Sequence, residues 1–183
     1  MSTKIVLKNV RLSYANLFEA KVAVSGGTAK FSTALLIPKG HPQLAALRDA
    51  INAEAVAKFG PDAIKEMAKT KSKYHHPLRD GDEEREGEAA YAGMYFANAS
   101  SKRQPQVVDQ KVQPIIDESE IFSGCWANVS INVYPFDVEG SKGIALGLNN
   151  VQLVKKDDRL GGATNAEEDF QVLDEAAADF KLD

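Results

Sequence analysis

Hydrophobic positions in the first 160 residues alternate with polar ones in short runs that are separated by turn residues. The most regular run covers residues 124–136, and successive residues of a strand point to opposite faces. One face holds Cys125, Ala127, Val129, Ile131 and Val133, and the other holds Trp126, Asn128, Ser130, Asn132 and Tyr134. Similar runs predict strands over residues 4–14, 90–100 and 143–156, a strand ending at Pro38 after a hairpin turn at 25–27, and a short extended piece within 102–109.

The alternation changes phase in two of these runs. A β-bulge is expected near Lys8-Asn9, because the apolar positions shift by one residue there. The residues expected in the core are Ile5 and Leu7 before the bulge, and Val10, Leu12 and Tyr14 after it. The run at 143–156 is expected to break near Gly147-Leu148.

Residues 41–59 carry the helical period instead. Pro42 suits the first turn of a helix, and an apolar stripe follows it at spacings of three and four residues. The stripe consists of Leu44, Leu47, Ile51 and Ala55. Gly60-Pro61 ends this helix, and a second, short helix is expected within 62–70.

Five or six strands with one main helix predict a mainly β protein of the α+β class. The architecture expected is an OB-like antiparallel β-barrel with long loops, a type that binds ligands on an open face crossed by loops. Residues 1–160 would form this single domain, with a helical insertion at about 41–70 and a charged loop at 71–90. Residues 161–183 would form an acidic C-terminal tail.

Composition agrees with a soluble globular protein, since 44% of the 183 residues are apolar and 26% are charged. The apolar stretches are too short for a membrane span, and the first residues lack the hydrophobic core of a signal peptide. A single cysteine, Cys125, excludes an intramolecular disulfide and a cysteine-based zinc site. A cytoplasmic location is therefore expected.

The net charge of −4 is unevenly distributed along the chain. Residues 161–183 carry seven acids and one lysine, whereas residues 1–160 carry 21 basic and 19 acidic residues. If the tail were helical, one face would hold Phe170, Leu173, Ala177 and Phe180. Such a tail can occupy a cationic DNA groove or bind partner proteins, and a frayed, solubilising terminus is the alternative.

A second charge contrast lies inside the charged loop. Residues 69–79 contain four Lys or Arg, two His and one Tyr, whereas residues 80–88 contain six acids and Arg85. Aromatic rings among cations are typical of proteins that bind single-stranded nucleic acid, where bases stack on the rings and cations contact phosphates. The residues that fit this pattern are Lys71, Lys73, Tyr74, Arg79, Tyr95, Lys102, Arg103, Trp126 and Tyr134. The alternative for Trp126 and Tyr134 is partial burial under a helix or loop.

The sequence gives little support for metal binding or catalysis. The neighbouring pair His75-His76 and the acids after Asp80 lack the spacing of a zinc or calcium site. No GxSxG, P-loop or dinucleotide motif occurs, so neither an enzyme nor a cofactor is expected. The carboxylates are expected in a turn that opens at Gly81, either solvated or paired to nearby lysines.

Several segments resemble a phage family of replicative single-stranded DNA-binding proteins, once classed as a domain of unknown function. They are VRLSYANLFEA (10–20), HPLRDGDE (76–83), YFANAS (95–100), PQVVD (105–109), IFSGCWANVSINVYPF (121–136) and KGIALGLNNVQLVKKDDRLGG (142–162). The resemblance implies an OB fold and non-catalytic binding of single-stranded DNA in phage replication or recombination. Among its motif residues are Arg79, Asp80, Tyr95, Asn98 and Trp126, which adds Asn98 to the expected DNA contacts.

These observations together predict a protein that protects single-stranded DNA in the cytoplasm of an infected bacterium. Duplex DNA is a second expected ligand, and phage or host replication proteins are the expected partners of the tail. Two alternatives remain open. A Mg²⁺-dependent recombination nuclease would use Asp80, Asp82 and Glu83, and a protein-only adaptor would use the tail and the amphipathic helix.

Overall fold

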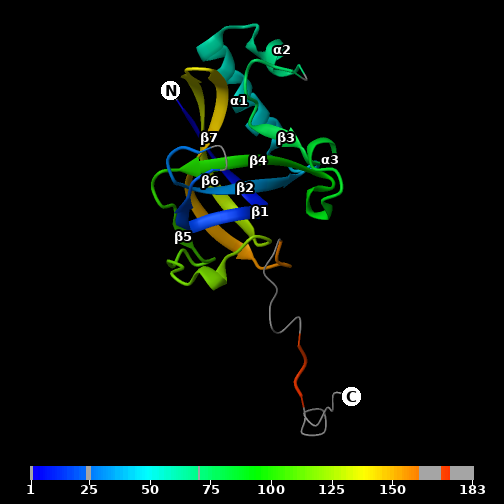
Figure 1. Ribbon diagram of the computed structural model, residues 1–183, viewed down its shortest axis with the longest axis vertical. Helices are drawn as coiled ribbons and strands as arrows, with labels where there is room; N and C mark the ends of the chain where they lie inside the picture. The colour runs from blue at the N-terminus through cyan, green and yellow to red at the C-terminus, as the bar shows by residue number, and fades with distance from the viewer. Residues whose placement is uncertain (1, 24–25, 70, 161–169, 174–183) are drawn as a thin grey trace.

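Five long strands close into a barrel in the computed structural model, which describes residues 2–23, 26–69, 71–160 and 170–173 (Figure 1). They are β1 (Thr3–Lys21), β2 (Lys30–Pro38), β4 (Met94–Ser101), β6 (Trp126–Val138) and β7 (Ser141–Lys155). Their order is β4-β2-β1-β6-β7, and β4 pairs with β7 to close the ring. The short strands β3 (Leu78–Asp80) and β5 (Gln106–Val108) extend the sheet beside β4 and β7.

This order confirms the OB-like fold, in which a five-stranded Greek-key barrel carries its ligand face on the second and third strands. One detail differs from an all-antiparallel barrel. The closing β4–β7 pair is parallel, through Ala99 opposite Leu146 and Ser100 opposite Gly147. In OB terms, β2 and β4 are the second and third strands, and the β6–β7 hairpin is the loop between strands four and five.

The barrel interior is filled by the faces that the alternation predicted. Cys125, Ala127, Val129, Ile131 and Val133 of β6 are all fully buried, as expected. The helix α1 (Leu44–Phe59) packs against β1, β6 and β7, with α2 (Ala63–Met67) following it (Figure 1). Its predicted apolar stripe is buried, and burial of each Leu or Ile side chain contributes roughly 1.5–3 kcal/mol.

Strand β1 contains the predicted bulge and a second irregularity that was not predicted. Its register with β6 shifts between Leu7 and Val10, and Asn9 has a φ of 57°. The register with β2 shifts again after Ser13, where Tyr14 has a φ of 47°. Tyr14 is 59% exposed, so its prediction as a core residue was wrong. The second bulge turns its ring outward, and alternation alone cannot reveal this reversal.

Strand β7 runs without the break expected at Gly147-Leu148. Its ladder with β6 continues on both sides of a bulge, where the register shifts between Ser130 and Ile131. The bulged residue Asn149 donates its side-chain amide toward Asn132 Oδ1 at 3.2 Å. A bulge at Asn149, two residues after Gly147, is therefore found where the break was expected.

The segment expected as a charged loop at 71–90 contains regular structure. It forms β3, the short helix α3 (Gly81–Glu84) and the 3₁₀ helix η1 (Ala89–Tyr91); another 3₁₀ helix, η2, covers Glu118–Glu120. Asp80 caps α3, because its Oδ1 accepts the Asp82 N–H at 2.9 Å. Gly81 leaves room only for a hydrogen, since a Cβ there would overlap the carbonyl oxygens of Tyr91 and Met94.

Most of the acidic tail, residues 161–169 and 174–183, lies outside the described residues, and so does the predicted helical face at Ala177 and Phe180. Residues 170–173 adopt neither helix nor strand, and Phe170 and Leu173 are exposed. Among the helices in the described part of the chain, none is long and apolar enough to cross a membrane.

Candidate nucleic-acid interface

The basic arm, defined here as residues 71–79, is fixed to the β6–β7 hairpin by backbone hydrogen bonds. The N–H of His75 donates to the Lys142 carbonyl at 2.8 Å, and the His75 carbonyl accepts from Ile144 N–H at 3.0 Å. Gly143 lies opposite His75, and a Cβ on it would overlap the His75 backbone. The glycine therefore permits close contact between the arm and the hairpin.

A cleft of about 790 Å³ lies between this arm, α1 and the hairpin, and we call it the arm cleft. Four of the predicted residues line it: Lys73, Tyr74, Arg79 and Tyr95. Lys69, from the basic stretch already identified in the sequence, also lines it. Two further cations that the sequence reasoning missed contribute to its walls, Arg48 of α1 and Lys142 of the hairpin. The carboxylates along it are Asp80, Glu83 and Glu84. Lys71 is exposed on the arm itself, outside the residues that line the cleft.

Both tyrosines of the arm cleft are held against protein groups. Tyr74 stacks on Phe59, with ring centroids 4.7 Å apart, and the Nζ atoms of Lys73 and Lys142 each lie 5.4 Å from its centroid. The Arg48 guanidinium lies 4.7 Å from the Tyr95 centroid. These contacts hold rings and cations together, which is the chemistry of a surface that takes bases and phosphates.

Two of the acids after the arm, Asp80 and Asp82, are paired with Lys39, which is one of the two arrangements expected for them. Lys39 Nζ lies 2.9 Å from Asp80 Oδ1 and 2.7 Å from Asp82 Oδ2. The hydrogen bond from Lys39 lowers the pKa of both carboxyl groups and, in return, raises the pKa of Lys39. Asp82 Oδ1 also accepts the Gly93 N–H at 3.0 Å, so this cluster connects α3 to β4.

The two histidines of the arm lie beside cations, His75 exposed and His76 half-buried. Burial lowers the pKa of His75, and the charge of Arg79 lowers it further. Burial also lowers the pKa of His76, which lies near Arg48. A lowered pKa favours the neutral form of both rings in the folded protein.

Strand β4 presents its predicted residues on both faces. Tyr95 lies toward the arm cleft, whereas Phe96 packs in a small cluster with Leu36 and Tyr91. Asn98, two positions beyond Phe96 on that same outer face, is exposed. Lys102 and Arg103 are exposed after the end of β4.

Trp126 and Tyr134 lie on the outer face of β6, and both are half-buried. Tyr134 lies at the end near the arm, since Phe136 on the same face has its ring centroid 6.0 Å from that of His75. The Trp126 indole donates to Asp157 Oδ2 at 2.8 Å, and Arg11 and Lys155 lie 5.9 and 5.5 Å from its centroid. Eight residues separate the two rings, which is roughly 27 Å along a strand. Amide side chains lie between them, including Asn128 and Asn132, and Arg103 shares a 450 Å³ groove with Asn132.

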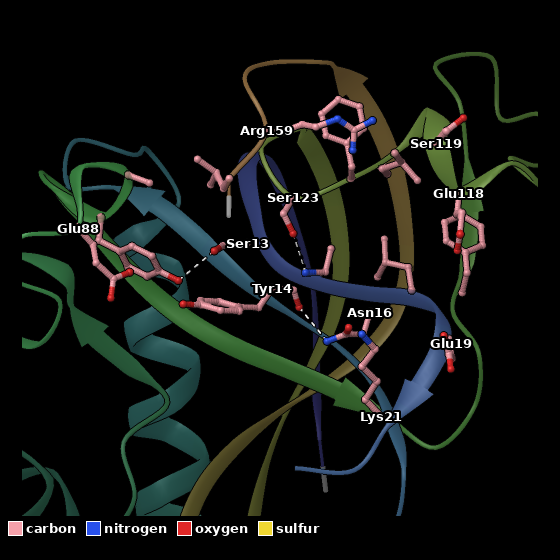
Figure 2. Close-up of a pocket in the computed structure, with 18 of the residues that line it drawn as sticks. Ser13, Tyr14, Asn16, Glu19, Lys21, Glu88, Glu118, Ser119, Ser123 and Arg159 are labelled. Atoms are coloured by element: carbon pink, nitrogen blue, oxygen red, sulfur yellow. Dashed lines mark hydrogen bonds between the residues drawn. The ribbon is translucent and has the colours of Figure 1, made fainter. Parts of the chain in front are cut away.

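A groove missed by the sequence reasoning runs along the outer face of β1 (Figure 2). It measures about 780 Å³, and we call it the Tyr14 groove. One side is formed by residues 88–91 and the other by residues 118–123 with Arg159 and Leu160. Figure 2 shows the exposed ring of Tyr14 between these two sides. The available signal was the sequence SYANLF (13–18). Its Tyr14 fell at a position that the alternation of β1 assigned to the core.

Among the described residues, no group of three or more His, Cys, Asp or Glu side chains could hold a metal ion. Lys39 Nζ lies between the carboxylates of Asp80 and Asp82, where a cation would have to bind.

Comparison with known proteins shows the family of this chain. Residues 3–181 match the family described as Enterobacter phage Enc34, ssDNA-binding protein. The chain belongs to this family. Protein p50 of Acyrthosiphon pisum secondary endosymbiont phage 1 is 32% identical over 176 residues, covering 93% of this chain and 94% of p50. The family resemblance drawn from the sequence motifs is thereby confirmed.

Solved structures share the fold. The single-stranded DNA-binding protein of bacteriophage Enc34, solved in complex with ssDNA, superposes with a TM-score of 0.70 at 24% identity over 87% of this chain and 89% of that chain. The bacteriophage T7 single-stranded DNA-binding protein gp2.5 superposes with a TM-score of 0.57 at 17% identity over 93% of this chain and 95% of that chain.

Proposed function

We propose that this protein binds single-stranded DNA during phage replication and recombination, without catalysing a reaction on it. Family membership supports this function, and the arm cleft is the main structural support for it in this chain. There, Tyr74 and Tyr95 each contact one or more cations within 5.5 Å on an OB barrel.

In the proposed complex, the phosphates contact Lys71, Lys73 and Arg79, assisted by Arg48 and Lys142. Each neutralised phosphate releases counterions, which makes the affinity depend on salt. Bases stack on Tyr74 and Tyr95. Phe59 holds the ring of Tyr74, and Arg48 and Lys39 lie over that of Tyr95, so binding costs little side-chain entropy.

The remaining predicted residues extend this path. Asn98 is exposed on β4, the third OB strand, and Lys102 and Arg103 follow it in sequence. Trp126 and Tyr134 offer rings on the outer face of β6, with Tyr134 at the end near the arm and Trp126 at the far end. A strand that reached them would wrap around the barrel, passing Arg103 and Asn132.

We also propose that two parts of the chain have separate roles. Residues 1–160 form the DNA-binding domain, and the acidic segment 161–183 regulates DNA binding or recruits phage or host replication proteins. The expected place of action is the cytoplasm of the infected bacterium. Duplex DNA is a weaker ligand in this scheme, because stacked and paired bases cannot reach aromatic rings.

Fluorescence anisotropy with a labelled dT30, alone and as a duplex with dA30, tests the proposal. We expect salt-sensitive binding with preference for the single strand. The DNA is then recovered after incubation with Mg²⁺ or EDTA and run on a denaturing gel. Intact DNA supports a binding protein, and Mg²⁺-dependent cleavage would support the nuclease. Absence of binding at low salt would favour the protein-only adaptor.

A further inference from the structure

We propose that the Tyr14 groove is a base-stacking subsite, and that Arg85 positions the Tyr14 ring within it. The inference rests on the proposed binding of single-stranded DNA, and it adds a second site whose contribution differs in kind from that of the arm cleft. Three observations support the inference: the backbone conformation at Tyr14, the contacts of Arg85 and the charge of the groove.

The backbone at Tyr14 is held in a conformation that tyrosine rarely adopts. Its φ of 47° lies in the left-handed region, which costs an ordinary residue roughly 1–2 kcal/mol. The bulge places the ring outside the barrel with 59% of its surface exposed. Bulges of this kind re-aim side chains beside functional sites, and strained positions cluster there. An aromatic ring exposed at such a cost is consistent with a partner that covers it.

Arg85 holds three rings in one arrangement. Its guanidinium carbon lies 5.5 Å from the centroid of Tyr14, 5.2 Å from that of Tyr91 and 5.7 Å from that of Phe96. Glu88 orients the guanidinium through a 2.9 Å contact between Arg85 Nη1 and Glu88 Oε1. Tyr91 and Phe96 are buried and pack edge to face, so they form a fixed base for Arg85. Tyr14 is the member of this cluster whose ring faces solvent.

The opposite side of the groove carries a second ring with a cation. Arg159 lies 3.9 Å from the centroid of Phe122. Its buried Nε has no hydrogen-bond partner among the described residues. Between the two sides, Ser13 bonds the Tyr91 hydroxyl at 3.0 Å and Ser123 accepts the Ala15 N–H at 2.9 Å (Figure 2). The groove is thus a fixed slot between aromatic and cationic groups.

The charges of the groove decide which part of DNA it suits. Three carboxylates line it, Glu19, Glu88 and Glu118, against Lys21 and Arg159. Arg85, beside Tyr14, is paired with Glu88, so the cations around the groove are all balanced by carboxylates. Such a surface does not attract a run of phosphates, whereas stacking of a neutral base on Tyr14 is unaffected by it. We therefore expect the groove to add affinity that depends on bases and not on salt, whereas the arm cleft contacts both bases and phosphates.

The experiment compares dT30 with an abasic 30-mer that has the same phosphates and no bases. Tyr14→Asn removes the ring, and asparagine adopts the left-handed conformation more readily than tyrosine. We expect it to lower the affinity for dT30 roughly 5- to 150-fold, the effect of one lost stacked base. Affinity for the abasic strand and the slope of log K against log salt should not change. Tyr14→Phe is the matched control and should bind as the wild type.

Arg85 is tested by a double-mutant cycle. Arg85→Lys keeps the charge and loses the planar guanidinium, so it should weaken binding to dT30 but add no further loss in the Tyr14→Asn background. An unchanged affinity for dT30 in Tyr14→Asn, or an equal loss on both oligonucleotides, overturns the subsite. Wild-type protein that fails to bind dT30 would instead overturn the proposed function on which the subsite rests.

Discussion

His75 and Gly143 lie opposite each other where the basic arm meets the β6–β7 hairpin. The His75 backbone exchanges hydrogen bonds of 2.8 and 3.0 Å with the residues on either side of Gly143. Gly143 has a φ of 154°, and a side chain there would overlap the His75 backbone. The position of the arm, and of the cleft beside it, therefore depends on a missing side chain.

Gly143→Ala should lower the free energy of unfolding and release the arm. Gly140→Ala is the matched control in the same hairpin, since Gly140 has a φ of 82° and open space around it. We expect about 1–2 kcal/mol of backbone strain at Gly140 and a further loss of about 1–3 kcal/mol at Gly143 from the overlap. Urea denaturation measures both values. Hydrogen exchange at the His75 amide should accelerate in Gly143→Ala alone, and equal exchange in the two variants would contradict the docking.

Charges on the arm should set the salt dependence of DNA binding. Replacing Lys71, Lys73 and Arg79 together by alanine is expected to flatten the slope of log K against log salt by about 0.7 per lost phosphate contact. Anisotropy titrations of dT30 between 50 and ~300 mM salt give the slope. The control replaces Lys8, Lys58 and Lys111, which line neither the arm cleft nor the Tyr14 groove. A slope that is the same in both triple variants would remove the arm from the interface.

Trp126 provides an intrinsic probe of the outer face of β6, because it is the single tryptophan of the chain. If DNA wraps to this face, a stacked base should quench its emission as dT30 is added. Tyr134→Ala should reduce this quenching by weakening the same path, without altering the emission of the free protein. Saturation by anisotropy with unchanged Trp126 emission would show that DNA stops before β6.

Acidification should destabilise the folded protein through the two arm histidines. Burial lowers the pKa of His75 and His76, so between their folded and unfolded pKa values the unfolded chain binds more protons. The stabilisation is complete above the unfolded pKa of about 6.5 and is lost as the pH falls below it. Urea denaturation at pH values of about 7.5 and 5.5, above the carboxylate range, should show this loss. The double variant His75→Gln/His76→Gln should lose less stability over that interval.

The strands and the main helix were readable in the sequence because burial imposes a period on local side chains. The inner face of β6, the stripe on α1 and the bulge near Asn9 were all predicted correctly. The motifs also identified the family, since they combine the residues of several distant segments. Local patterns were less informative at 71–90, where Lys39, from another part of the chain, pairs with Asp80 and Asp82 at the start of α3.

Which residues share a surface was decided by the tertiary structure alone. Barrel closure brings the hairpin of β6 and β7 to the arm, so that Lys142 and Arg48 join Lys73 and Tyr74 in one cleft. Barrel closure also places Trp126 outside the arm cleft. Tyr14 shows why the sequence alone could not reveal these surfaces: a single extra residue in a strand reverses the direction of a side chain. The sequence determines the chemistry available to this protein, and long-range strand register determines where that chemistry is brought together.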